Sequence, residues 1–223
     1  LDGARNGFLK ALEDAGYKDG ENLKIEYQNA QGDQAVAQSI AESFVSDSKD
    51  LILAIATPTA QAAYNATKEI PVLITAVTDP IQAGLAKSLE KSETNVTGTS
   101  DATPIDKQFA LIRELLPESK KVGIVYNTSE LNSEVQVAQA KVIAQKYGLE
   151  LVIKGVTSVN DLAQVLDSLL KEVDVLYTPT DNLIVSATPL VVKKAMENKC
   201  KWWSLCSIKF WTNYRAWSWF KIF

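Results

Sequence analysis

Short apolar runs alternate with amphipathic helical patterns along this chain, and the alternation constrains its fold more than any other feature. The run at 72–77, rich in Ile, Leu and Val, suits a parallel strand that is covered on both faces. Repeated strand–helix units build open parallel sheets with right-handed crossovers, so we predict an α/β fold. The predicted strands are 23–27, 51–56, 72–77, 121–126, 149–154 and 173–177. The predicted helices are 2–15, 34–46, 59–68, 104–116, 130–147, 158–170 and 182–197.

A stretch of small, turn-forming residues at 95–104 divides the strand–helix units into two sets. We interpret it as a crossing between two lobes, with an ordinary surface loop as the alternative. The predicted domains are an N-terminal α/β lobe at 1–100, which lacks a first strand, and a C-terminal α/β lobe at 101–199. The halves echo each other, since a Thr-Pro-Thr triplet follows a strand in both, and this parallel predicts another strand near residue 200.

The last residues, 200–223, differ in composition from the rest of the chain. They hold all five tryptophans and both cysteines, together with basic residues and no acidic one. Their apolar pattern follows neither a period of 2 nor one of 3.6. Our hypothesis is an aberrant, frameshifted tail; the alternative is a genuine aromatic, cationic anchor for a membrane surface or a partner.

Composition excludes several classes of function. The chain has no histidine, which removes Ser/His/Asp relays and imidazole metal ligands, and its two cysteines are too few and too widely spaced for a zinc or CxxC site. With 27 acidic residues against 23 basic ones, it has no basic footprint for nucleic acid. No phosphate-loop, dinucleotide or nucleophile-elbow motif occurs. We therefore expect no catalysis, no metal and no cofactor.

Polar clusters follow four of the predicted strands, where ligands bind in open α/β sheets. Helix N-capping is the competing explanation for each of them. A carboxylate would suit the hydroxyl and N–H groups at a helix start, and an aspartate would suit an ammonium, so an α-amino acid matches the set better than a polyol or sugar. The candidate ligand-binding residues are Thr57, Thr59, Gln61, Asp79, Asn127, Ser129, Thr180, Asp181 and Asn182.

Several ordered motifs resemble one known family. They are AGYKDGEN at 15–22, YQNAQGD at 27–33, ATPTAQ at 56–61, VTDP at 77–80, GTSD at 98–101, VYNTSE at 125–130 and YTPTDN at 177–182. The family is the ABC-transporter substrate-binding proteins that include the tryptophan- and tyrosine-binding lipoproteins, and the resemblance covers about residues 1–199.

The resemblance implies a type I periplasmic-binding fold, in which two Rossmann-like lobes close on a ligand. It further implies an extracytoplasmic, monomeric component of an ABC importer that captures Trp, Tyr or Phe and delivers it to a membrane permease. Members carry a lipid-anchoring signal, which does not precede Leu1 here, and they continue after Lys199 with an apolar strand. The rival hypotheses are an effector-binding domain of a transcription regulator, a sugar-binding protein of the same fold, and an α/β enzyme.

Overall fold

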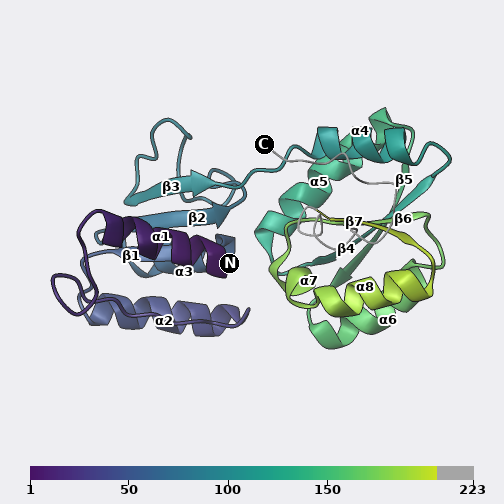
Figure 1. Ribbon diagram of the computed structural model, residues 1–223. Helices are drawn as coiled ribbons and strands as arrows, with labels where there is room; N and C mark the ends of the chain where they lie inside the picture. The colour runs from purple at the N-terminus through teal and green to yellow at the C-terminus, as the bar shows by residue number, and fades with distance from the viewer. Residues whose placement is uncertain (205–223) are drawn as a thin grey trace. The chain divides into compact units, whose positions relative to one another are not determined.

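The computed structural model describes residues 1–204 of the 223-residue chain (Figure 1). The chain divides into two compact units, Leu1–Thr103 and a second that begins at Pro104. The predicted frameshift over 205–223 lies outside the described residues.

The first unit holds a three-stranded parallel sheet in the order β1-β2-β3. Its strands are β1 (Ile52–Ile55), β2 (Val72–Val77) and β3 (Val96–Ser100), and its helices are α1 (Asp2–Asp14), α2 (Gln34–Ser46) and α3 (Thr57–Ala66). Helix α3 packs on the sheet around Ala60 and Ala63, and α2 packs on α3 through small alanine side chains. Because the crossover from β1 to β2 is α3, the start of α3 lies at the carboxyl edge of the sheet.

One sequence prediction is wrong in this unit, and a second is incomplete. Residues 23–27 form no strand: Leu23 makes one isolated bridge with Asp19, and side chains hold the rest, including a Lys49–Glu26 ion pair. A strand requires a neighbour with which to pair, and in the structure this segment pairs with neither edge strand of the three-stranded sheet. Residues 95–104 are more than a crossing, because Val96–Ser100 is β3 and pairs with β2.

The second unit holds a four-stranded parallel sheet in the order β5-β4-β6-β7. Its strands are β4 (Lys121–Asn127), β5 (Glu150–Val156), β6 (Val175–Thr178) and β7 (Lys201–Ser204). Its helices are α4 (Ile105–Leu115), α5 (Leu131–Lys146), α6 (Val159–Leu169), α7 (Asn182–Ser186) and α8 (Thr188–Glu197). Helices α4 and α5 cover one face, and α6, α7 and α8 cover the other (Figure 1).

The predicted helix at 182–197 is two helices, α7 and α8, that meet at Ala187. Pro189 cannot donate a backbone N–H to the preceding turn, and the Thr188 hydroxyl instead donates to the Val185 carbonyl at 2.7 Å.

The strand that the internal echo predicts near residue 200 is confirmed as β7, which pairs with β6 in parallel. Its Trp202 side chain is 8% exposed and belongs to the core beneath α8. Residues 201–204, which we assigned to an aberrant tail, are therefore part of the sheet. Burial of Trp202 against α6 and α8 residues explains how a segment without clear periodicity still forms a strand.

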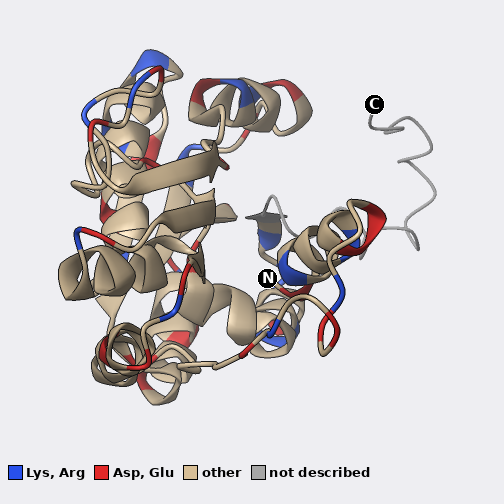
Figure 2. Cartoon of the chain, turned by 90° about the vertical axis from the view of Figure 1, so that its left-hand side faces the viewer, with Lys and Arg blue, Asp and Glu red and all other residues tan. Residues whose placement is uncertain are grey.

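The α/β fold with parallel sheets is confirmed in both units. Within residues 1–204, we find no helix that combines the length and the apolar character needed to cross a membrane. Figure 2 shows the basic residues dispersed over separate helices and loops, next to acidic ones.

Candidate functional site

In the first unit, the start of α3 combines strained backbone with a buried hydroxyl. Ala56, the residue between β1 and α3, has φ 87° and ψ 156°, a region that L-residues rarely occupy. The next residue, Thr57, is 2% exposed, and its Oγ1 atom has no hydrogen-bond partner. The first intrahelical bond joins the Ala60 N–H to the Ala56 carbonyl, so the N–H groups of Thr57 and Thr59 precede the helical ladder. This helix start therefore presents hydrogen-bonding groups and the positive end of the helix dipole.

Three other candidates in this unit have structural partners. Thr59 Oγ1 donates to the carbonyls of Ile55 at 2.6 Å and Ala56 at 2.9 Å, which ties α3 to the end of β1. Gln61 Nε2 donates to the Ala83 carbonyl at 3.3 Å. The Asp79 carboxylate accepts from the backbone N–H groups of Ile81 and Gln82, which makes it a turn-capping residue. Of the four candidates in this unit, Thr57 alone has a side-chain polar atom that is buried without a hydrogen-bond partner.

In the second unit, Asp181 lies beneath the carboxyl edge of the sheet, with 1% of its surface exposed. Its Oδ2 accepts from the Asn127 N–H at 2.6 Å and the Ser133 hydroxyl at 2.7 Å. Its Oδ1 accepts from the Ile184 N–H at 2.9 Å, so Asp181 is the N-cap of α7. Burial, and then the neighbouring Glu130, raises the pKa of Asp181 above its ordinary value.

Glu130 is a site residue that sequence reasoning did not select. Its side chain is 5% exposed, and its carboxylate accepts five hydrogen bonds. The donors are the side-chain amides of Asn127, Asn132 and Asn182 and the backbone N–H groups of Asn182 and Leu183. The residue stands at the start of a predicted helix, where a glutamate is typical of an exposed first turn. In the structure its partners come from the end of β4, from α5 and from the start of α7.

The remaining candidates of the second unit lie around these two carboxylates. Asn127 and Asn182 donate their side-chain amides to Glu130 at 3.1 and 2.6 Å. Ser129 is exposed, and its N–H donates to Asn127 Oδ1 at 3.0 Å.

Thr180 is held against α5 by three of its groups. The Thr180 N–H donates to Gln136 Oε1, the Thr180 Oγ1 accepts from Gln136 Nε2, and the Thr180 carbonyl accepts from Asn132 at 2.8 Å. The turns after β4 and β6, residues 127–130 and 180–183, are thus joined to each other and to the first turns of α5.

A second buried amide in this network keeps one group unsatisfied. Asn132 is 4% exposed, and its Nδ2 donates to Glu130 and to the Thr180 carbonyl. Its Oδ1 has no hydrogen-bond partner. Two carboxylates and one amide oxygen therefore lie together, and no described Lys or Arg forms an ion pair with Glu130 or Asp181.

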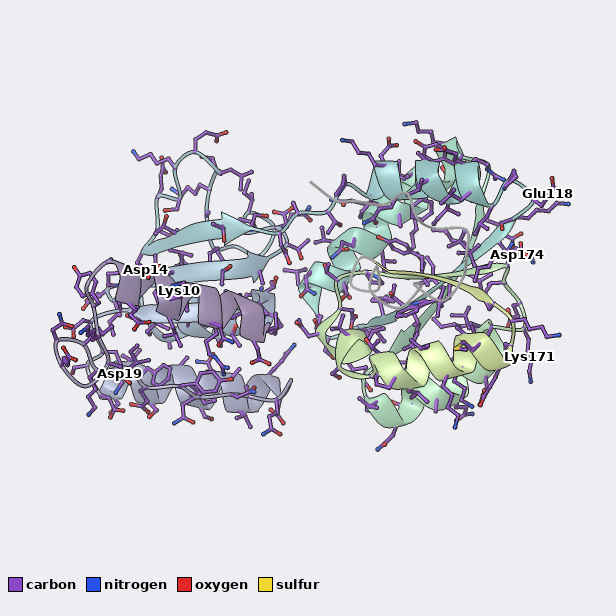
Figure 3. All side chains as sticks on the ribbon, viewed as in Figure 1. Lys10, Asp14, Asp19, Glu118, Lys171 and Asp174 are labelled. Carbon is purple, nitrogen blue, oxygen red and sulfur yellow. The ribbon has the colours of Figure 1, made fainter. Side chains whose placement is uncertain are left out.

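The opposite edge of this sheet holds an acidic residue with a purely structural role. Figure 3 labels Asp174 at that edge, away from α7. Its Oδ2 accepts from the backbone N–H groups of Lys120 and Lys121 at 2.8 and 2.9 Å, and these bonds lower the pKa of Asp174. Among residues 1–204, no three His, Cys, Asp or Glu side chains group in a way that could hold a metal ion.

The arrangement can bind but offers no nucleophile–base pair among the candidate residues. The first unit presents hydrogen-bond donors suited to an anion. The second unit presents buried acceptors and negative charge, which suit a cation or a hydrogen-bond donor.

Comparison with known proteins agrees with a binding role. The tyrosine-binding protein of Clostridioides difficile (strain R20291) is 58% identical over 199 residues, which are 89% of this chain and 58% of that protein. The chain thus spans less than two thirds of that relative. The structure of the ABC domain from Streptococcus pneumoniae in complex with L-Trp is 39% identical, with a TM-score of 0.86 over 89% of this chain and 67% of that one.

A conserved domain protein from Vibrio cholerae is also 39% identical, with a TM-score of 0.89 over 91% of this chain and 69% of that one. The family model described as ABC transporter substrate binding protein matches residues 1–203. That match covers most of the chain, including all but the last residue of β7. The chain therefore belongs to the ABC transporter substrate-binding protein family.

Proposed function

We propose that this chain captures an aromatic α-amino acid for an ABC importer, and that in the first unit the start of α3 suits the carboxylate of such a ligand. Two relatives support the ligand class, since one is a tyrosine-binding protein and the structure of the other contains L-Trp. The observation that carries the proposal is the buried Thr57 hydroxyl, which has no partner at the start of α3.

The carboxylate end of the ligand fits the start of α3. A carboxylate accepts hydrogen bonds only, and Thr57 Oγ1 is a buried donor that the protein leaves unused. An unsatisfied buried hydroxyl costs about 1–3 kcal/mol, so a ligand oxygen at this position would recover that free energy. The N–H groups of Thr57 and Thr59 and the helix dipole add favourable interactions with the same charge.

Considered by itself, the second unit suits an ammonium group at its acidic turns. An ammonium group offers three donors and a positive charge. Asn132 Oδ1 is a buried acceptor without a donor, and Glu130 and Asp181 add negative charge beside it. In this proposal Asp181 acts mainly through its charge, because its oxygens already accept bonds from Asn127, Ser133 and Ile184. Ser129, Thr180 and Asn182 lie on the same turns, and Gln61 and Asp79 support the first unit's edge.

Calorimetric titration of the chain with L-Trp, L-Tyr and L-Phe tests the proposal. We expect binding of at least one, and Thr57→Val should weaken it about 10- to 100-fold, because a hydrogen bond to a charged group contributes about 1.5–3 kcal/mol. Tryptamine, which lacks the carboxylate, should bind wild type and variant equally. Thr97→Val, which removes an exposed hydroxyl from β3, serves as the matched control. Equal affinity of the Thr57→Val variant for the amino acid would reject the carboxylate site.

The family also supports finer proposals about the whole protein. We propose that it acts outside the cytoplasm as a monomer, that its full-length form is tethered by a lipid anchor, and that it delivers ligand to a membrane permease without catalysis of its own. The match to the substrate-binding family supports a place outside the cytoplasm and delivery to a permease. Light scattering of the ligand-bound protein tests the monomer, and unchanged ligand recovered after prolonged incubation tests the absence of catalysis.

A further inference from the structure

The turns after β4 and β6 each carry a carboxylate that accepts hydrogen bonds from the backbone of the other turn. Glu130, on the first turn, accepts from the backbone N–H groups of Asn182 at 3.0 Å and Leu183 at 3.2 Å, both at the start of α7. Asp181, on the second turn, accepts from the Asn127 N–H at 2.6 Å, where β4 ends. Each turn therefore satisfies backbone donors of the other, and the bonded residues are 52 to 54 positions apart in the sequence.

We propose that Glu130 is a positioning residue for ligand binding, which holds the turns at 127–130 and 180–183 in a single arrangement. This inference rests on the proposed function, because those turns carry Ser129 and Thr180, two of the proposed ligand-binding residues. Glu130 itself is 5% exposed, and all five of its bonds go to protein groups on the two turns, α5 and α7. Its effect on the ligand is therefore indirect.

The distribution of donors explains why a carboxylate is needed here. Glu130 Oε2 accepts from Asn132 Nδ2 and from both nitrogens of Asn182, while Oε1 accepts from Asn127 Nδ2 and the Leu183 N–H. Glutamine has the same shape but only one acceptor oxygen, and its amide nitrogen would face donors. The substitution would leave buried N–H groups unpaired on whichever turn faces the nitrogen.

Burial of two neighbouring carboxylates also costs free energy of folding. We therefore infer that these residues serve a purpose other than stabilising the fold. Glu130 contributes to raising the pKa of Asp181, which is the mark of repulsion between the two. No described Lys or Arg pairs with either group, so neutral N–H and O–H donors alone offset the burial. Apolar side chains in buried positions often stabilise a fold more than charged ones do. The gain from Glu130 is a fixed geometry of the two turns.

The test compares Glu130→Gln with Glu134→Gln, an exposed glutamate on α5, at a temperature where circular dichroism shows all proteins folded. We expect Glu130→Gln to weaken binding of L-Trp or L-Tyr about tenfold or more, and the control to leave it unchanged. Amide exchange should accelerate at Leu183 and also at Asn127. The N–H of Asn127 is bonded to Asp181, so its response reports coupling between the turns.

Two outcomes would overturn the inference. One is a Glu130→Gln variant that unfolds at a lower temperature yet binds as tightly as the wild type, which would make the role purely structural. The other is faster exchange at Leu183 with none at Asn127. A wild-type chain that binds no aromatic amino acid would instead refute the proposed function, so the two failures are distinguishable.

If Glu130→Gln does not fold, amide hydrogen exchange of the wild-type chain, measured with and without L-Trp, tests the same coupling between the two turns. Ligand should slow exchange at Asn127, Asn182 and Leu183 together, and slowing confined to one turn would overturn the inference. Glu130→Asp, which keeps the charge but is shorter by one methylene, should show an affinity between those of the wild type and Glu130→Gln.

Discussion

Replacing Asp181 with Ala should destabilise the second unit by about 2–4 kcal/mol at neutral pH. The substitution strips an acceptor from three donors, the N–H groups of Asn127 and Ile184 and the hydroxyl of Ser133. Each buried donor left unpaired costs about 1–3 kcal/mol. The substitution also removes a carboxylate that is 1% exposed and repelled by Glu130, which is favourable. The net cost is therefore smaller than the sum of the costs of the three unpaired donors.

The pH dependence of this cost has a defined sign. Burial and Glu130 raise the pKa of Asp181 above its ordinary value of 3.8, so the folded chain holds this proton more tightly than the unfolded chain. The part of the wild-type stability that comes from this raised pKa is therefore fully present below 3.8 and is lost as pH rises through the raised value, while the hydrogen bonds that the Asp181 oxygens accept remain. Because alanine does not titrate, the difference in stability between wild type and variant should narrow as pH rises through this window.

Urea denaturation at a series of pH values measures both quantities. Tryptophan fluorescence reports unfolding of the second unit through Trp202, which is buried in the core of that unit. Glu134→Ala, at an exposed position on α5, is the control and should differ from wild type by less than about 0.5 kcal/mol. A cost for Asp181→Ala below about 1 kcal/mol would refute the hydrogen-bond argument. A difference that widens with rising pH would show that hydrogen bonding outweighs burial and repulsion at this carboxylate.

Two further substitutions test contacts that stabilise each unit from within. Arg113→Ala should lower the free energy of unfolding, measured with denaturant, by about 2–4 kcal/mol. The reason is that the guanidinium donates to four backbone carbonyls, those of Tyr147, Gly148, Pro117 and Ser119. An Arg113→Lys variant as stable as the wild type would contradict this. Gly98→Ala should cost more than about 3 kcal/mol and reduce the β-sheet signal in circular dichroism, because the new Cβ would lie 2.0 Å from the Ile74 carbonyl oxygen, at φ 152°. Thr97→Ala, one residue away and exposed, should be near neutral.

Local patterns in the sequence were sufficient for the type and order of most elements. The apolar run at 72–77 and the helix at 34–46 appear in the structure with the predicted bounds, because periodicity reports which faces must be buried. The echo between the halves also located β7, even though its residues are unusual in composition. The polar residues that the sequence places at strand ends lie at the carboxyl edges of the two sheets, since parallel strands align their carboxyl ends.

The tertiary structure decided which of those polar residues still have hydrogen-bonding capacity to offer. Thr57 and Thr59 look alike in the sequence, but Thr59 donates to the backbone of β1 while Thr57 is buried without a partner. Asp181 and Glu130 are joined through donors about 50 positions away, and no local pattern encodes such partners. The segment 23–27 has the composition of a strand and yet forms none, because pairing depends on a neighbouring strand. Sequence determines which faces are apolar and where turns occur, whereas the partner of each polar group depends on which distant elements the fold places beside it.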